Sequence, residues 1–202
     1  DRFHNHAHIS GSDPGALGRS RLSNASWQRG APDRGRIDLE AMLELAEDIG
    51  HLFTLTSALN LAALLRIWRR EPELAYAHAD KSFKISEANG FRFTYAWSRM
   101  LRGQAIFELG RQNDGLREVE YGFEHMEALN ARLMEPWFIA VLAQTKMNVG
   151  ELEEAAELLA RAHASIAESG TNFVLPAVHC LDGELRLHES YGGYDRDAAY
   201  TA

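Results

Sequence analysis

The stretch GELEEAAELLARAHASIAESG, residues 150–170, decides the fold of this chain. Alanine, leucine and glutamate fill it, and these are strong helix formers. Gly150 and Gly170 stand on either side, where glycine commonly ends a helix. The stretch therefore predicts a helix over residues 151–168. It also raises the question of whether that helix belongs to a repeated set.

The same landmarks return every 40 residues. Steps of 40 back from the two glycines reach glycine at most positions, and the asparagine among the exceptions tolerates the left-handed conformation. The two sets are Gly30, Arg70, Gly110 and Gly150, and Gly50, Gly90, Asn130 and Gly170. A third set, mostly aromatic, is Phe53, Phe93, Leu133 and Phe173. Two sets of small residues share the period: Ser23, Ala63, Gly103, Ala143 and Gly183, and Gly35, Ala75, Gly115 and Ala155. Independent sets with one period indicate a repeat architecture.

Each period contains two helices. We expect first helices over residues 52–69, 92–109, 132–148 and 172–190, and second helices over residues 35–49, 73–89, 113–129 and 151–168. Asp13-Pro14 begins the earliest first helix, with aspartate as N-cap and proline in the first turn. Short connections make consecutive helices antiparallel neighbours. The small residues, 12 positions apart within a pair of helices, fit where two axes cross closely.

The small residues resemble the tetratricopeptide repeat. A third small position lies about seven residues beyond the second, at Ser82, Gly122 and Ala162, with Met42 departing from the pattern. The usual unit has 34 residues, whereas the unit here has 40. The resemblance implies an all-α fold: a right-handed superhelical array of antiparallel helix hairpins over residues 13–190. We expect about four units and a C-terminal capping helix. Residues 1–12 would be an extended segment, and residues 191–202 a tail or a truncated next repeat.

Three segments indicate a particular group of tetratricopeptide-like repeats. SDPGAL (12–17), WSRMLRGQAIFELG (97–110) and HCLDGELRLHES (179–190) resemble the long-unit repeats at the carboxyl end of large bacterial signalling proteins. In those proteins a nucleotide-cyclase or transcription-regulator domain is coupled to an ATPase module and a helical array. One departure is Asp182 before Gly183, where a basic residue such as Arg102 before Gly103 is expected. Because the chain starts at Asp1, we expect a fragment or a processed product.

The composition limits the functional classes. There are 29 acidic and 21 basic residues, a net charge of −8, which argues against a general nucleic-acid binder. Charged residues interrupt the apolar runs before the ~18 residues that a membrane span needs. The single cysteine, Cys180, excludes an internal disulfide framework and fits a reducing compartment, so we expect a cytoplasmic protein.

Sites of catalysis are not evident in the sequence. His4, His6 and His8 alternate near the start, and imidazoles bind zinc or nickel, but a site needs several converging ligands. We interpret this segment as solvated or lightly packed, with a metal contact as the weaker alternative. The chain contains no H-E-x-x-H, P-loop or G-x-S-x-G motif. We expect no cofactor and no catalytic residue.

The resemblance implies a binding groove lined by the first helices. The tetratricopeptide pattern places the following residues on its inner face: Leu17, Ser20, Asn24, Trp27, Ser57, Asn60, Leu64, Ile67, Trp97, Met100, Gln104, Phe107, Trp137, Ala140, Gln144, Met147, Ala177, Cys180, Glu184 and Leu187. The candidate partner-binding residues among them are Asn24, Trp27, Asn60, Trp97, Met100, Gln104, Trp137, Gln144 and Glu184. Their amides are suited to pairing with a peptide backbone, and two tryptophans one period apart to clamping an apolar side chain. The alternatives are that these residues only pack on one another, or line a small-molecule pocket.

These observations predict a non-catalytic interaction and regulatory module of a larger bacterial signalling protein. Its partner would be a peptide, another protein or a neighbouring domain of the parent chain, held in the groove. The few basic residues on this face make capture of a terminal carboxylate less expected. One alternative is a homo-oligomeric scaffold, most simply a homodimer. The other is a metal-dependent enzyme that uses the histidine-rich start.

Overall fold

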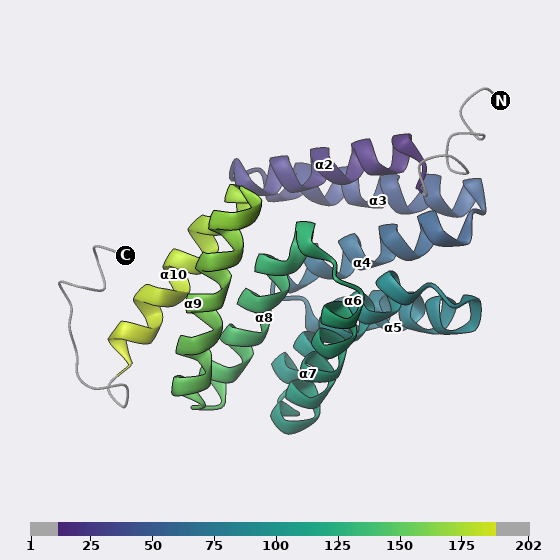
Figure 1. Cartoon of the computed structure of the whole chain (residues 1–202). Coiled ribbons are helices and arrows are strands. Elements are labelled where there is room, and N and C mark those ends of the chain that lie inside the picture. Colours follow the sequence, from purple (N-terminus) through teal and green to yellow (C-terminus); the bar gives the residue numbers. More distant parts are fainter. Residues whose placement is uncertain (1–11, 189–202) are drawn as a thin grey trace. The chain divides into compact units, whose positions relative to one another are not determined.

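The computed structural model describes residues 12–188, and these residues form an all-α structure without a β-strand (Figure 1). The α-helices are α2 (Pro14–Gln28), α3 (Pro32–Ile49), α4 (Leu52–Trp68), α5 (Pro72–Asn89), α6 (Arg92–Glu108), α7 (Gln112–Ala128), α8 (Glu135–Asn148), α9 (Leu152–Ser169) and α10 (Leu175–Leu187). Two short 3₁₀ segments, η1 (Arg132–Met134) and η2 (Asn172–Val174), precede α8 and α10. None of the helices in this part of the chain is both long and apolar enough to cross a bilayer.

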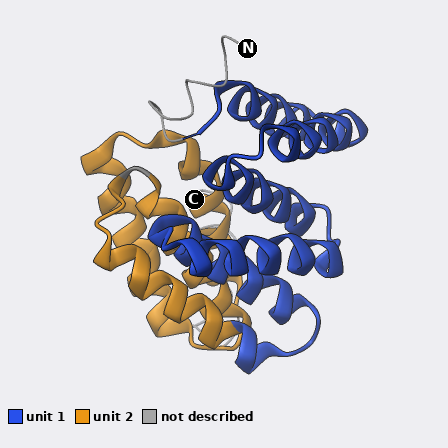
Figure 2. Cartoon of the chain, turned by 90° about the vertical axis from the view of Figure 1, so that its right-hand side faces the viewer, with its two compact units in different colours: residues 1–115 blue, residues 116–202 orange. Residues whose placement is uncertain are grey.

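The chain divides into two compact units, coloured separately in Figure 2. Unit 1 ends at Gly115 and unit 2 begins at Leu116, so that the boundary falls within α7. In unit 1, α2, α3, α4 and α5 each pack against the next helix, and α4 also contacts α2 and α6. In unit 2, α9 packs between α8 and α10, and α8 also contacts α10. Within each unit, first helices therefore touch one another as well as their hairpin partners.

The start of α2 is fixed by the predicted N-cap. The Asp13 side chain accepts hydrogen bonds from Gly15 N (2.8 Å) and Ala16 N (3.0 Å), and Pro14 occupies the first turn. The backbone N–H of Asp13 donates to Thr54 Oγ1 at 3.0 Å, which ties this end of α2 to the first turn of α4. The N-cap therefore satisfies two orphan helix donors and also joins two first helices.

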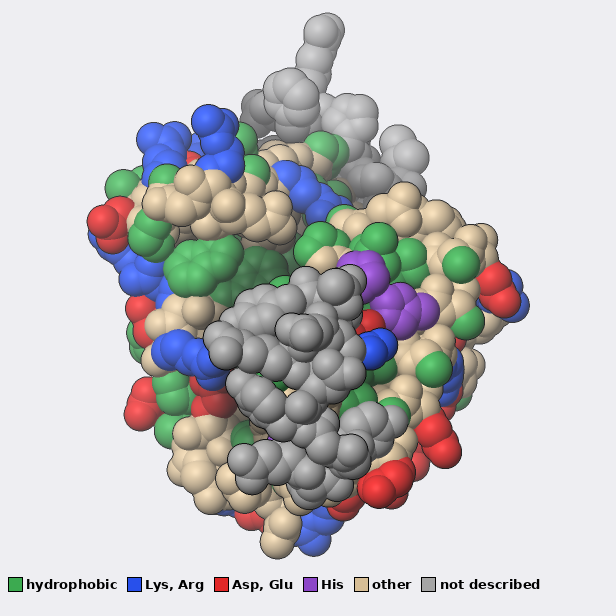
Figure 3. Space-filling model, turned by 90° about the vertical axis from the view of Figure 1, so that its left-hand side faces the viewer, with side chains coloured by type: hydrophobic (Ala, Val, Ile, Leu, Met, Phe, Trp, Pro, Cys, Tyr) green, Lys and Arg blue, Asp and Glu red, His purple; other side chains and the backbone are tan. Residues whose placement is uncertain are grey.

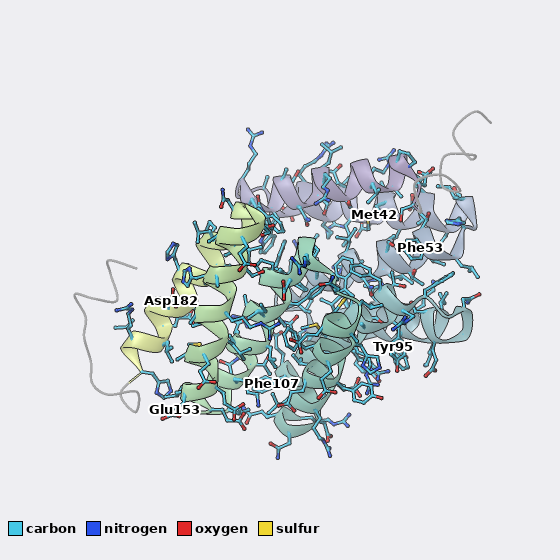
Figure 4. The ribbon with its side chains drawn as sticks, in the orientation of Figure 1. Met42, Phe53, Tyr95, Phe107, Glu153 and Asp182 are labelled. Atoms are coloured by element: carbon cyan, nitrogen blue, oxygen red, sulfur yellow. The ribbon has the colours of Figure 1, made fainter. Side chains whose placement is uncertain are left out.

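One cluster of the core of unit 1 is formed by buried residues of α2, α3 and α4. Its buried members are mostly alanine, leucine and methionine, at Ala16, Leu39, Met42, Ala46, Ala58, Ala62 and Leu65. Met42, which departs from the small-residue pattern, is fully buried here (Figure 4). Ten of the 17 residues of α4 are buried, against three of the 15 in α2. A helix buried on most sides is expected for an element flanked by neighbours.

The small residues do lie at close helix crossings. Ser23 Oγ donates to Gly35 O at 2.8 Å, between α2 and α3. A Cβ added to Gly115 would lie 2.7 Å from Gly103 O, so α6 and the start of α7 approach more closely than any side chain permits. The corresponding pairs Ala63–Ala75 and Ala143–Ala155 have no exposed surface. The prediction that these positions mark helix contacts is confirmed within each unit.

All eight predicted landmark positions have positive φ. The six glycines have φ between 67° and 89°, and Arg70 and Asn130 adopt the same region at 59° and 53°. At five of these turns two backbone hydrogen bonds recur: at the first, Gly30 N donates to Trp27 O and Ala31 N donates to Ser26 O, both at 2.9 Å. Equivalent pairs close the turns at Arg70, Gly90, Gly110 and Gly150. This is the Schellman arrangement, and it explains why the landmarks favour glycine.

The predicted helix bounds need small corrections. The first expected second helix, over residues 35–49, begins earlier, because Pro32 is accepted at a first helical position where its missing N–H costs nothing. The helices expected from residues 132 and 172 begin with η1 and η2, because Pro136 and Pro176 follow and cannot donate the next helical hydrogen bond. The last helix ends at Leu187 rather than at residue 190.

Candidate functional site

In unit 1 the predicted partner-binding residues lie on three first helices that contact one another. Asn24 and Trp27 are on α2, Asn60 is on α4, and the α6 residues are Trp97, Met100 and Gln104. The contacts of α4 with both α2 and α6 bring these helices together along one side of the unit. The spacing of three and four residues keeps each set on one helical face. We refer to these positions of unit 1 together as its first-helix face.

The residues on this face differ in exposure. Asn60 and Met100 have no exposed surface, and Trp97 keeps 8% of its surface exposed. Asn24, Trp27 and Gln104 are partly exposed. Trp27 packs against the core of α2, α3 and α4, and the ring of Trp97 lies 6.0 Å from that of Phe93. In this structure Trp27 and Gln104 have more surface open to a partner than Asn60 or Met100.

Two amide side chains on the first-helix face carry unsatisfied acceptors. Asn60 Nδ2 donates to Thr94 O at 3.1 Å, which bridges α4 and α6, but Asn60 Oδ1 is buried without a hydrogen-bond partner. Gln104 Oε1, on α6, is also buried without one. A buried acceptor left unpaired costs about 1–3 kcal/mol. Because both oxygens are buried, a donor from a partner reaches them only after the side chains that cover them move.

In unit 2 the predicted residues lie on α8 and α10. Trp137 is half-buried, and its ring centroid lies 5.1 Å from that of Phe138 in an edge-on arrangement. Gln144 and Glu184 are exposed, as is Cys180. Because α8 contacts α10, these residues belong to the first-helix face of unit 2. The predicted clamp of Trp97 and Trp137 joins two different units, and it stays a prediction.

The second helices of unit 2 border a charged depression that the sequence did not reveal. It measures about 520 Å³ and is lined from α7, α8 and α9 by Glu120, Phe123, Glu124, Leu142, Lys146, Glu154, Glu157, Leu158 and Arg161. The ammonium of Lys146 lies 2.6 Å from Glu120 and 2.6 Å from Glu151, and 3.0 Å from Glu154. Arg161 Nη2 forms ion pairs with Glu127 at 2.6 Å and with Glu135 at 3.2 Å. Both cations are thus occupied by carboxylates of the same unit.

The charges around Lys146 act on its pKa in opposite directions. Burial of the side chain lowers the pKa of Lys146, whereas hydrogen bonds from the ammonium to Glu120, Glu151 and Glu154 raise it. The carboxylates prevail, so the pKa of Lys146 is raised well above its ordinary value. The three carboxylates therefore hold Lys146 in its charged form.

A polar triad lies in the last hairpin. His163 is on α9, while His179 and Asp182 are on α10, and all three are partly buried. His163 Nε2 lies 2.6 Å from Asp182 Oδ2, and the rings of His163 and His179 lie 5.2 Å apart. Histidine side chains gather on one part of the face shown in Figure 3, and Asp182 is labelled on α10 in Figure 4. The sequence analysis predicted no site here, although the departure at Asp182 was a signal that could have indicated one.

The weaker metal candidates of the sequence, His4, His6 and His8, lie outside the described residues. Comparison of the chain with known protein families finds no matching family, and no curated protein matches it.

Proposed function

We propose that this chain is a non-catalytic interaction module of the tetratricopeptide-repeat type within a larger bacterial signalling protein. Its first-helix faces bind a peptide or a partner domain, and binding shifts the output of the parent protein between states. The observation that carries the proposal is the contact of α4 with α2 and α6, which joins recurring positions into one face. The partly exposed side chains of Trp27 and Gln104 support the proposal, because they leave surface on that face for a partner.

The proposal is tested with tryptophan variants of the parent protein. Trp97→Ala and Trp137→Ala, singly and together, remove aromatic surface from the first-helix faces of units 1 and 2. Trp68→Ala is the matched control, because Trp68 is a half-buried tryptophan of α4 outside the candidate positions and packs against the core. We expect partner recovery and output to fall in the first variants and to persist in the control at equal folded fraction by circular dichroism. Equal recovery in all variants would contradict binding on these faces.

A photo-crosslinking experiment avoids the buried positions. A crosslinking residue at exposed Gln144 should capture the partner, whereas one at exposed Glu153, on the second helix α9, should not (Figure 4). Equal capture from both positions would indicate contact without a preferred face. The neighbouring-domain version of the proposal predicts a crosslink within the parent chain rather than to another protein.

A homo-oligomeric scaffold is the second candidate, and exposed apolar side chains favour it. The first hairpin exposes 57% of Leu22 and 50% of Ile37, and the last hairpin exposes 63% of Phe173. Exposed large apolar side chains are typical of surfaces that pair with another chain. Light scattering over a concentration series tests this candidate, and a strict monomer would exclude it.

A further inference from the structure

The triad of His163, His179 and Asp182 has the composition and spacing of a metal site. One ligand atom from each residue lies within 4.8 Å of the others. The two α10 residues are separated by three positions, which places them on one side of that helix, facing His163 across the packed α9–α10 pair. Two elements thus present three donors to one point, which is the convergence that the alternating histidines of residues 4–8 do not provide from their spacing alone.

The preceding repeats show that helix packing does not require polar groups at these positions. Forty residues earlier the corresponding residues are Phe123, Ile139 and Leu142, all buried. Eighty residues earlier they are Phe83, Arg99 and Arg102, and the Arg102 guanidinium lies 3.9 Å from the Phe83 ring centre. In the first repeat they are Leu43, Leu59 and Ala62. Among these four repeats, only the one that contains α9 and α10 has a potential metal ligand at all three positions.

A structural ion pair accounts for only part of this change. The 2.6 Å contact of His163 with Asp182 explains two of the three residues. It does not explain why His179 lies with its ring 5.2 Å from that of His163 and a ring nitrogen within reach of both partners. A shared cation explains the third residue, because it would bind both imidazoles and the carboxylate.

The donor set selects the class of cation. Imidazole nitrogen suits zinc and its first-row neighbours, whereas magnesium and calcium require oxygen ligands. In a tetrahedral zinc site with bonds of roughly 2.0–2.2 Å, ligand atoms lie about 3.3 Å apart. The triad reaches that spacing by small side-chain rotations that lengthen the His163–Asp182 contact and draw in His179. Three protein ligands leave a fourth position for water.

We propose that His163, His179 and Asp182 bind one divalent transition-metal ion, zinc by preference, and that the ion fastens α10 to α9. α10 contributes only three buried residues, Val178, Leu181 and Leu185, so its attachment gains most from a further link. This site is independent of the partner-binding faces of the proposed function. An ion bound only by the folded hairpin would stabilise it by mass action.

Calorimetric titration of the untagged, chelator-treated chain with zinc chloride tests the site. We expect one zinc ion per chain, and the same result after His4, His6 and His8 are all replaced by alanine. His179→Gln and Asp182→Asn should each weaken binding by more than the roughly 10–100-fold that loss of an outer-shell partner costs. His125→Gln, a change on α7 far from the triad in sequence, should leave binding unchanged. Circular dichroism of each metal-free variant verifies that it is folded.

Cobalt substitution identifies the ligands independently of stability. Co²⁺ in the chain should show the visible absorption of a tetrahedral site with nitrogen and oxygen ligands, and the spectrum should persist in Cys180→Ser. A thiolate charge-transfer band lost in Cys180→Ser would overturn the assignment. Zinc binding that is lost when His4, His6 and His8 are replaced but survives His179→Gln and Asp182→Asn would also overturn the assignment. The absence of stoichiometric zinc binding would overturn it as well.

Discussion

The turn residues Arg70 and Asn130 adopt a backbone conformation that L-amino acids avoid. The left-handed region costs roughly 1–2 kcal/mol for an ordinary side chain, and less for asparagine. The exposed Arg70–Glu108 pair, at 3.0 Å, contributes little in return, because 82% of the Arg70 side chain is exposed.

We therefore expect Arg70→Gly to raise the free energy of unfolding by about 0.5–1 kcal/mol, after the entropy of glycine in the unfolded chain is subtracted. Asn130→Gly should give a smaller gain. Urea denaturation measures both. A loss of stability in Arg70→Gly would mean that the arginine side chain contributes more than the strain it imposes.

Gly115 lies where no side chain fits. Its added Cβ would lie 2.7 Å from Phe107 N and 2.8 Å from Phe107 Cα, and backbone atoms cannot rotate away. We expect Gly115→Ala to lower the free energy of unfolding by about 2–3 kcal/mol, because α6 and α7 must separate.

Gly18 provides the matched control for this substitution. It lies in α2 with no atom within 4 Å of an added Cβ, so Gly18→Ala should stabilise by about 0.5–1 kcal/mol. Thermal or urea denaturation distinguishes the two. Similar values for both variants would show that the crossing at Gly115 relaxes easily.

At the scale of elements, an ion pair reinforces two of the five recurring turns. Arg66 Nη1 lies 2.5 Å from Glu71 Oε2, and Lys146 Nζ lies 2.6 Å from Glu151 Oε2. In each pair the backbone is bonded as well, since Glu71 N donates to Arg66 O and Glu151 N donates to Lys146 O. Arg66 and Glu71 are therefore joined by both a side-chain and a backbone contact across their turn, and so are Lys146 and Glu151.

Lys146→Met should reveal how much the second of these turns depends on charge. The lysine is 8% exposed while its three carboxylates are more exposed, so we expect a loss of about 1–2 kcal/mol in the free energy of unfolding. The control Lys81→Met breaks an exposed pair with Glu47 and should cost less than about 0.5 kcal/mol. Equal losses in the two variants, measured by urea denaturation, would show that the Lys146 cluster adds nothing specific.

The turn at Glu71 predicts a pH dependence. Burial raises the pKa of Glu71, but hydrogen bonds from Arg66 and Arg69 outweigh it and hold the pKa below its ordinary value of 4.5. The stabilisation is therefore complete above that value and is lost as the pH falls through the lower pKa of the folded state.

The free energy of unfolding of Glu71→Gln should accordingly be lower than that of the unsubstituted chain at pH 7. The difference between the two should vanish in acid. Glu73→Gln, at an exposed position in the first turn of α5, is the control and should be nearly neutral. Denaturation from pH 7 down to pH 3 measures the effect. A difference that persists unchanged at the acid end would show that the amide disturbs packing instead.

The elements were predictable because local residues determine them. The glycine landmarks specify left-handed turns, and the small residues specify crossings, so the bounds of α4, α5, α6 and α9 agree with the sequence to within a residue. The starts of α8 and α10 were not predicted, because the 3₁₀ geometry depends on how Pro136 and Pro176 sit in the first turn. The triad escaped for a different reason: His163 and Asp182 are 19 residues apart, and only the packing of α9 on α10 brings them together.

The candidate site was predictable only in outline. The period identified which helices share a face, but not how deeply each side chain is buried. Asn60 was expected to bind a peptide, and its Nδ2 instead donates to Thr94 O across two helices. Its role as a partner-binding residue stays a prediction, which now concerns its unsatisfied oxygen.

At the scale of the whole molecule, burial is uneven along the chain. α4 and α8 each bury ten residues, whereas α2 and α10 each bury three. Local opening exposes fewer apolar contacts in a helix that buries few residues, so α2 and α10 should open more readily than α4 and α8.

Hydrogen exchange should therefore be fastest in the amides of α2 and α10 and slowest in those of α4 and α8. Mass spectrometry of peptic fragments measures this order. Zinc, if bound as proposed, should slow exchange in α10 and leave α2 unchanged. Uniform protection across the helices would indicate that the chain opens as a single cooperative block.

The recurring turn has a consequence for how such a chain changes over generations. The turns at Gly30, Arg70, Gly110 and Gly150 close with the same pair of backbone hydrogen bonds and are 40 residues apart, so a gene segment that encodes forty residues can be copied or lost between two of them. The new junction then resembles one that already exists. Gain or loss of a single codon within a helix, by contrast, turns the remainder of that helix by about 100° and moves its buried side chains away from the core. Length among relatives of this chain should therefore vary in whole blocks of forty residues.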